Sequence, residues 1–246
     1  MQNNFNISRL ILLAICLLSG IVANAQFTEE KKISDDDMAY ENQMMRLHVI
    51  NEEMEETSET AVDIEIQGLD PRDPVVFEDV VDTTIQIPAY RRYTVTAVKE
   101  DFMFYSERFW PEEKKIHVQD ITLKKLAPGL KSDVPGIIFL GSETEIYHKS
   151  AVALQNLYDF LVKNPEVTIA VNGHVNDPDN LYSEKFLEKA SRERAQAVID
   201  FLVNKGIDES RMTAVGKGAT EMKYPDPKTD WENEENRRVE IEILSL

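Results

Sequence analysis

The sequence contains a single cysteine, Cys16, among 246 residues. One thiol forms no disulfide within a chain, and Cys16 lies in an N-terminal segment that we expect to be removed. The mature protein should therefore have no thiolate metal ligand and no cysteine nucleophile. The histidines are far apart in the sequence, without the spacing of a metal-binding motif, so we predict neither a metal nor another cofactor. They are His48, His117, His148 and His174.

Basic residues are also scarce. The chain has 27 Lys and Arg against 45 Asp and Glu, which gives a formal net charge of -18 at pH 7. Nucleic acids and anionic lipids are bound by clustered positive charge, so this balance argues against both as partners. The sequence has no Gly-x-Ser-x-Gly elbow and no phosphate-binding loop. We therefore predict a protein that is not an enzyme and has no catalytic residues.

The one long apolar run lies at the N-terminus. Leu10–Leu18 follows the basic Arg9 and precedes Ala23-Asn24-Ala25, which has the small-x-small pattern of a signal-peptidase site. The run is too short to cross a bilayer. Residues 1–25 are therefore predicted to be a secretory signal peptide that is cleaved after Ala25. Ile15 before Cys16 is not the small residue that a lipoprotein signal requires.

Composition divides the remainder of the chain. Residues 26–60 are acidic and predict a linker with at most one helix, which Ser34 and Asp37 would cap. Residues 61–127 hold short alternating runs separated by turn formers, which predicts a small antiparallel β-domain, a sandwich. Its aromatic side chains could form a carbohydrate platform, but core packing is favoured in so small a domain. Residues 128–135 are a Pro- and Gly-containing connector.

Residues 136–246 show strands alternating with helices. A buried strand at 137–140 precedes a helix, and the alternating strand 167–171 leads into Gly173-His174. A second helix is expected over 183–205, followed by Gly206 as its C-cap. Further strands are predicted at 211–215 and 239–243. The expected fold class is α+β, with a β-sandwich-like domain followed by a layered βαβαβ(β) domain.

The second helix carries a charged residue on its apolar face. Arg194 shares a stripe with Ala190, Val198 and Leu202. A guanidinium in that position needs an acceptor, which is either a nearby glutamate or the carboxylate of a ligand. The loop after Gly173 is rich in small polar groups and is either an ordinary turn or a binding loop at a strand end. It contains His174, Asn176, Asp177, Asp179 and Asn180.

Several motifs occur together in the order that they have in one known family. They are Phe139 after a short strand, Gly173-His174, Ser191-Arg192-Glu193-Arg194-Ala195, Lys205-Gly206-Ile207 and Asn236-Arg237-Arg238-Val239-Glu240-Ile241. Over residues 136–244 the chain thus resembles the OmpA-like C-terminal domain. The preceding β-region is similar to that of OmpA-family proteins of the Bacteroidetes type.

This resemblance implies a peptidoglycan-binding protein of the periplasm, associated with the outer membrane or cell wall. In the family, an arginine and an aspartate hold the diaminopimelate of the stem peptide. Arg194 matches the arginine, while Asn176 occupies the position of the aspartate, so Asp177 or Asp179 would replace it. His174 and Arg237 complete the predicted site. The alternative is a degenerate module that serves as a scaffold for outer-membrane or other envelope proteins.

Overall fold

The computed structural model describes residues 42–52, 61–69, 73–89, 91–111, 116–139 and 144–246. All of them belong to one compact unit, Ile33–Leu246. The predicted signal peptide, its cleavage site after Ala25 and the helix cap at Ser34 lie outside the described residues.

The first part of this unit consists of two β-sheets. One has the strand order β4 (Asp82–Pro88), β1 (Asn42–Asn51), β7 (Ile116–Leu123). The other has the order β3 (Val75–Val80), β2 (Val62–Gln67), β5 (Tyr93–Ala97), β6 (Tyr105–Phe109). Alternate side chains of both sheets share one core, as the predicted sandwich requires. Among them are Met45, Leu47, Ile64, Ile66, Tyr93 and Ile121.

Strand β1 lies within the segment for which a linker was expected. Met45, Leu47 and Val49 alternate with polar residues and are fully buried, so this part of 26–60 belongs to the sandwich. The strand also pairs in parallel with β7, whereas we expected an antiparallel domain. A parallel pair needs a long crossover, and the strands of the second sheet lie between β1 and β7 in the sequence.

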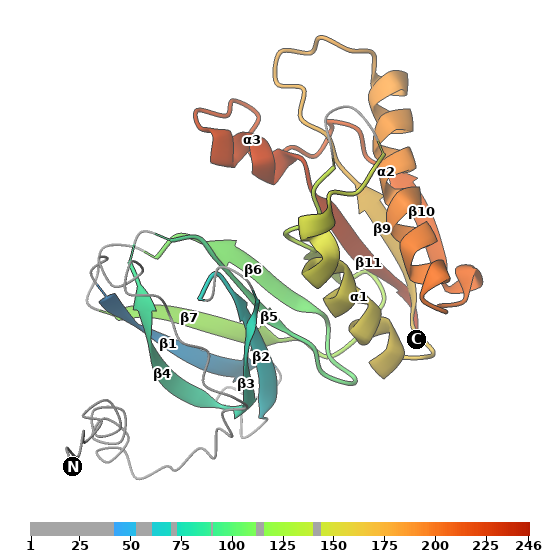
Figure 1. Ribbon diagram of the computed structural model, residues 1–246. Coiled ribbons are helices and arrows are strands. Elements are labelled where there is room, and N and C mark those ends of the chain that lie inside the picture. Colours follow the sequence, from blue (N-terminus) through green and yellow to red (C-terminus); the bar gives the residue numbers. More distant parts are fainter. Residues whose placement is uncertain (1–41, 53–60, 70–72, 90, 112–115, 140–143) are drawn as a thin grey trace, which may run out of the picture. The chain divides into compact units, whose positions relative to one another are not determined.

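The second part has a four-stranded sheet with the order β10 (Met212–Gly216), β9 (Thr168–Gly173), β11 (Val239–Ser245), β8 (Lys131–Asp133). Strands β10 and β9 are parallel, and β11 runs antiparallel to β9 and β8. Helices α1 (Ala151–Lys163) and α2 (Glu184–Asn204) cover one face of the sheet (Figure 1). The predicted α+β class is confirmed.

Some local expectations for this part differ from the structure. The edge strand β8 lies in the predicted connector, while the expected first strand is reduced to a bridge between Phe139 and Ile146 in the described residues. A short helix, α3 (Asp230–Asn236), was not expected. It forms in a polar segment because Thr229 and Glu232 make a reciprocal capping box at its N-terminus. The 3-10 turns η4 (His148–Ser150) and η5 (Glu209–Arg211) complete the elements.

The apolar residues that recur at helical spacing in α1 and α2 form the core of this second part, as the sequence predicts. Leu154, Leu157 and Leu161 of α1 are buried, as are Val198 and Leu202 of α2, and they pack with the inward residues of β9 and β11. The C-terminus of α2 turns at Gly206, whose φ of +104° suits glycine, as predicted. The amide of Ile207 then donates to the Leu202 carbonyl at 3.1 Å.

Two glycines allow α2 to lie directly on the sheet. A Cβ on Gly173 would be 2.0 Å from the Ser191 carbonyl oxygen, and one on Gly216 would be 2.0 Å from that of Glu188. Ser191 is fully buried, and its hydroxyl donates to the Glu188 carbonyl and accepts from the amide of Gly218. This close contact fixes the position of α2, and therefore of Arg194, relative to β9 and β10.

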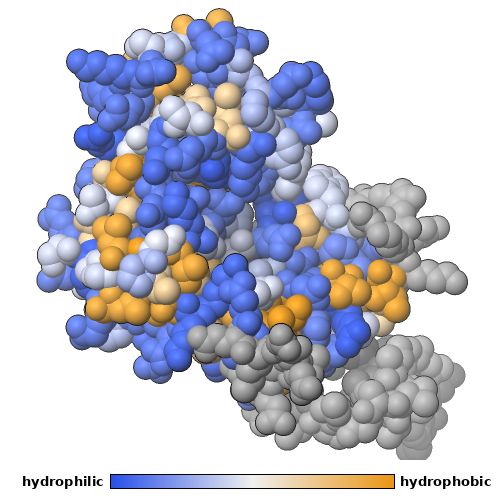
Figure 2. Space-filling model, turned by 180° about the vertical axis from the view of Figure 1, so that it is seen from behind, coloured by the Kyte–Doolittle hydropathy of each residue, from blue (hydrophilic) through white to orange (hydrophobic). Residues whose placement is uncertain are grey.

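The face of the molecule drawn in Figure 2 is mainly polar. Figure 2 shows hydrophobic residues in small separate patches among hydrophilic ones, consistent with the acidic composition. Among the described residues, every helix is too short or too polar to cross a membrane.

Candidate functional site

Arg194 occupies the predicted stripe of α2. Ala190 and Arg194 are partly buried, whereas Val198 and Leu202 further along the stripe are fully buried. The guanidinium carbon lies 5.3 Å from the centroid of the Phe139 ring, at cation–π distance. Burial, followed by the charge of Arg237, lowers the pKa of Arg194 from its ordinary value. An arginine nevertheless stays charged at neutral pH, so a half-buried cation lies against an aromatic ring here.

Arg237 adds a second positive charge to this region. It follows α3 directly and is exposed to solvent. Its positive charge is the second cause, after burial, of the lowered pKa of Arg194. Two neighbouring guanidinium groups favour an anion, and each can bind a carboxylate with two parallel hydrogen bonds.

Asn176 links the loop after β9 to α3. Its Nδ2 donates to Asn233 Oδ1 at 2.7 Å, and its Oδ1 accepts from Asn236 Nδ2 at 2.8 Å. Asn236 is fully buried and also bonds to the backbone N and O of Tyr224 at 2.9 and 2.7 Å. These amides place the residue before Arg237 against the loop after β9. Asn236 belongs to one of the motifs quoted from the sequence, but no feature of the sequence predicts this contact.

The two candidate carboxylates of the loop differ in exposure. Asp177 is 4% exposed, and its oxygens accept from the amides of Leu181 and Tyr182 at 3.0 and 3.1 Å. It therefore shapes the loop, as the turn interpretation of this segment expected. Asp179 is exposed and is the carboxylate of this loop that solvent reaches.

His174 lies on the other face of the sheet. The position of Gly173 against α2 means that the next residue of the strand points away from the helices. His174 is 2% exposed and lies close to Glu221 and Glu240. The structure thus joins Asn176 to Asn236, the residue before Arg237, and places Arg194 on α2, while the His174 side chain lies on the face of the sheet away from that helix.

The described geometry defines an α+β domain with helices on one face of its sheet and a basic site beside an aromatic ring. Residues 138–237 match the OmpA family. The chain therefore carries an OmpA-like C-terminal domain.

Two curated relatives illustrate the similarity. Outer membrane porin F of Pseudomonas aeruginosa is 33% identical over 102 residues, which cover 41% of this chain and 28% of the relative. Outer membrane protein A of Bordetella avium is 40% identical over 70 residues, which cover 28% of this chain and 36% of the relative. The chain thus spans only 28% and 36% of the lengths of these relatives.

A similar solved structure is the peptidoglycan-associated lipoprotein from Burkholderia pseudomallei. It is 18% identical, and the match covers 44% of this chain and 86% of that one with a TM-score of 0.37. The names of the two relatives place them in the outer membrane, and the name of the solved protein associates it with peptidoglycan.

Proposed function

We propose that the OmpA-like domain binds the peptidoglycan stem peptide without catalysing a reaction and thereby tethers an envelope component to the cell wall. In this proposal the protein is exported and acts in the periplasm. The observation that carries it is the half-buried guanidinium of Arg194 over Phe139, within the segment that matches the OmpA family.

The chemistry of the ligand suits this arrangement. The free amino-acid end of diaminopimelate presents a carboxylate and an ammonium group at a fixed separation. Arg194 would bind the carboxylate, with Arg237 strengthening the local positive potential. The Phe139 ring restricts water on one side of the guanidinium, which strengthens a charge-assisted hydrogen bond of about 1.5–3 kcal/mol.

The ammonium group requires an acidic partner from the loop. Asn176 is neutral, and its oxygen already accepts from Asn236. Asp177 is buried and engaged by two backbone amides, so Asp179 is the carboxylate that a ligand reaches with least rearrangement. We therefore expect Asp179→Asn to weaken peptidoglycan binding directly, and Asp177→Asn to act through the shape of the loop.

Sedimentation with purified peptidoglycan sacculi tests the proposal. We expect Arg194→Ala to lower the affinity by about tenfold or more, the equivalent of one lost charge-assisted bond. Arg192→Ala is a matched control because Arg192 is exposed on the same helix and pairs with Glu188. It should sediment like the wild type, and circular dichroism should confirm that both variants are folded.

The same assay separates the alternative function. If the wild-type protein stays in the supernatant, the tether proposal is wrong and the domain is a scaffold for envelope proteins. Equal losses in Arg194→Ala and Arg192→Ala would show only nonspecific attraction of the sacculus to positive charge.

A further inference from the structure

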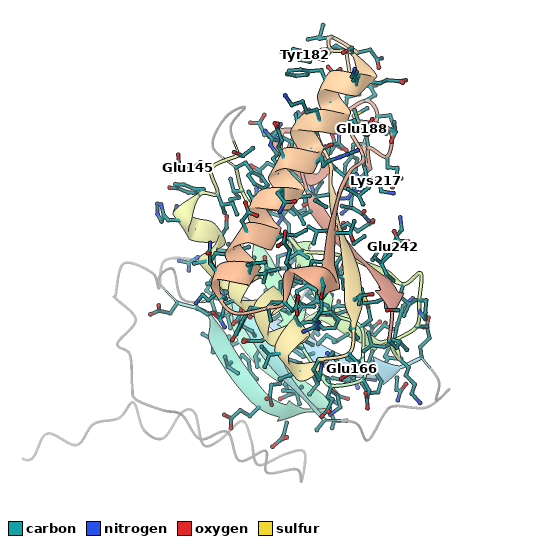
Figure 3. All side chains as sticks on the ribbon, turned by 90° about the vertical axis from the view of Figure 1, so that its right-hand side faces the viewer. Glu145, Glu166, Tyr182, Glu188, Lys217 and Glu242 are labelled. Atoms are coloured by element: carbon teal, nitrogen blue, oxygen red, sulfur yellow. The ribbon has the colours of Figure 1, made fainter. Side chains whose placement is uncertain are left out.

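Three side chains gather on the face of the sheet away from α1 and α2. His174 follows β9, Glu240 lies on the neighbouring strand β11, and Glu221 lies in the segment after β10. One ligand atom from each of the three lies within 4.8 Å of the others. Two neighbours of the cluster are labelled in Figure 3: Lys217, which pairs with Glu221, and Glu242, which lies two residues after Glu240 on β11.

The histidine in this cluster is buried without a hydrogen bond. His174 is 2% exposed, and neither its Nδ1 nor its Nε2 has a partner among the described residues. The Oδ1 atom of buried Asn172 also lacks a partner there, while its Nδ2 donates to Glu240 at 2.9 Å. Each such buried polar atom costs about 1–3 kcal/mol, so the fold bears a cost that a bound ligand would offset.

The position of the imidazole suits metal binding. Both ring nitrogens are buried without a hydrogen-bond partner among the described residues, so an ion displaces no existing bond of His174. Glu221 is exposed and Glu240 is partly buried, so an ion has a route to the cluster from solvent.

We propose that His174, Glu221 and Glu240 bind a divalent transition-metal ion of the zinc class, with solvent completing its coordination. One imidazole and two carboxylates are ligands that zinc accepts, whereas calcium prefers oxygen ligands alone. Ligand atoms around tetrahedral zinc are about 3.3 Å apart, so the side chains of the cluster have to close in from separations of up to 4.8 Å. This site is independent of the proposed peptidoglycan site.

Lysines compete with the metal ion for the same carboxylates. Lys217 Nζ lies 3.5 Å from Glu221, and Lys131 Nζ lies 3.4 Å from Glu240. Lys131 also lies 3.6 Å from Glu242, which can keep it as a partner when an ion takes Glu240. Arg238 bonds to Asp133 at 3.1 Å, so part of its charge is already balanced. The metal ion thus displaces two ion pairs whose side chains are partly exposed to solvent.

Isothermal titration calorimetry with ZnCl₂ tests the site. The full chain is first treated with a chelator and dialysed to remove bound metal. We expect one zinc ion per chain and a higher melting temperature in zinc, because the ion binds only the folded cluster. Glu221→Gln should weaken zinc binding by about tenfold or more. Because Glu221 is exposed, this variant should fold normally. CaCl₂ should give no comparable binding.

Two control variants make the result specific. Glu242→Gln removes a neighbouring carboxylate on β11 that is not in the cluster but pairs with Lys131, and it should weaken zinc binding much less than Glu221→Gln does. His48→Gln tests another imidazole–carboxylate pair, because His48 Nδ1 lies 3.0 Å from Asp120. Absence of zinc binding, or binding that His48→Gln abolishes and Glu221→Gln leaves unchanged, would overturn the proposal.

Discussion

Replacement of Gly173 by alanine is the most direct test of how α2 is held on the sheet. The added Cβ would lie 2.0 Å from the Ser191 carbonyl oxygen and 2.9 Å from its carbonyl carbon. Both atoms belong to the backbone, so no change of rotamer relieves the overlap. The helix has to move away from β9 by more than about 1 Å before an ordinary van der Waals contact is restored.

The movement would affect the most buried part of the domain. Ala195, Val198 and Leu202 of α2 are fully buried in the core, and a gap of 1 Å removes about a quarter to a half of each dispersion contact. Overpacking of this kind typically costs about 1–3 kcal/mol, and a backbone clash belongs at the upper end. For a domain of this size, 3 kcal/mol lowers the melting temperature by roughly 10–20 °C.

Thermal unfolding followed by circular dichroism measures this effect. Gly129→Ala is a suitable control because a Cβ there meets nothing within 4 Å, although the φ of +87° is strained for alanine. That strain alone costs about 1 kcal/mol. If Gly173→Ala unfolds within a few degrees of Gly129→Ala, α2 does not depend on the glycine contact and the argument fails.

Three other predictions follow from the site. Asn176→Asp adds a carboxylate for the ligand ammonium and should raise peptidoglycan affinity by about tenfold or more; unchanged affinity would contradict an ammonium contact at this position. The variant should be slightly less stable, because Asn233 Oδ1 loses the hydrogen bond that Asn176 Nδ2 donates. Asn236→Ala should lower the free energy of unfolding measured in a urea titration by about 1–2 kcal/mol, since the buried Asn236 amide bonds to the backbone of Tyr224 and to the side chain of Asn176. Burial, followed by the charge of Arg238, lowers the pKa of His174 to about 4, so between this value and about 6.5 the unfolded chain binds the proton more readily than the folded protein. In chelator-treated protein, the free energy of unfolding should therefore fall as the pH drops from about 6.5 to about 4 and then level off, and His174→Gln should lack this fall.

The sequence predicted well those features that depend on periodic burial. The spacing of Leu154, Leu157 and Leu161 placed one helix, and Gly206 placed the end of the other. Arg194 was recognised because a charge on an apolar stripe is unusual. Strand β1 was missed because the composition of the surrounding acidic segment outweighed a short alternation.

The relations between distant residues could not be predicted from the sequence. Nothing in the sequence indicates that Asn176 lies against Asn236, or that Glu221 and Glu240 lie beside His174. These contacts depend on strand order and register, which place β11 between β9 and β8. The wide spacing of the histidines excludes a metal motif on a single element, but it carries no information about ligands that three separate segments would supply, as in the proposed zinc site.

The contact between α3 and the loop after β9 has a consequence for experiments at different salt concentrations. Asn176, Asn233 and Asn236 join these elements through neutral amides, which neither ionise nor attract counterions. Salt screens the attraction between Arg194 and a ligand carboxylate but leaves the amide contacts almost unchanged. A salt titration should therefore weaken peptidoglycan binding well before it loosens the loop.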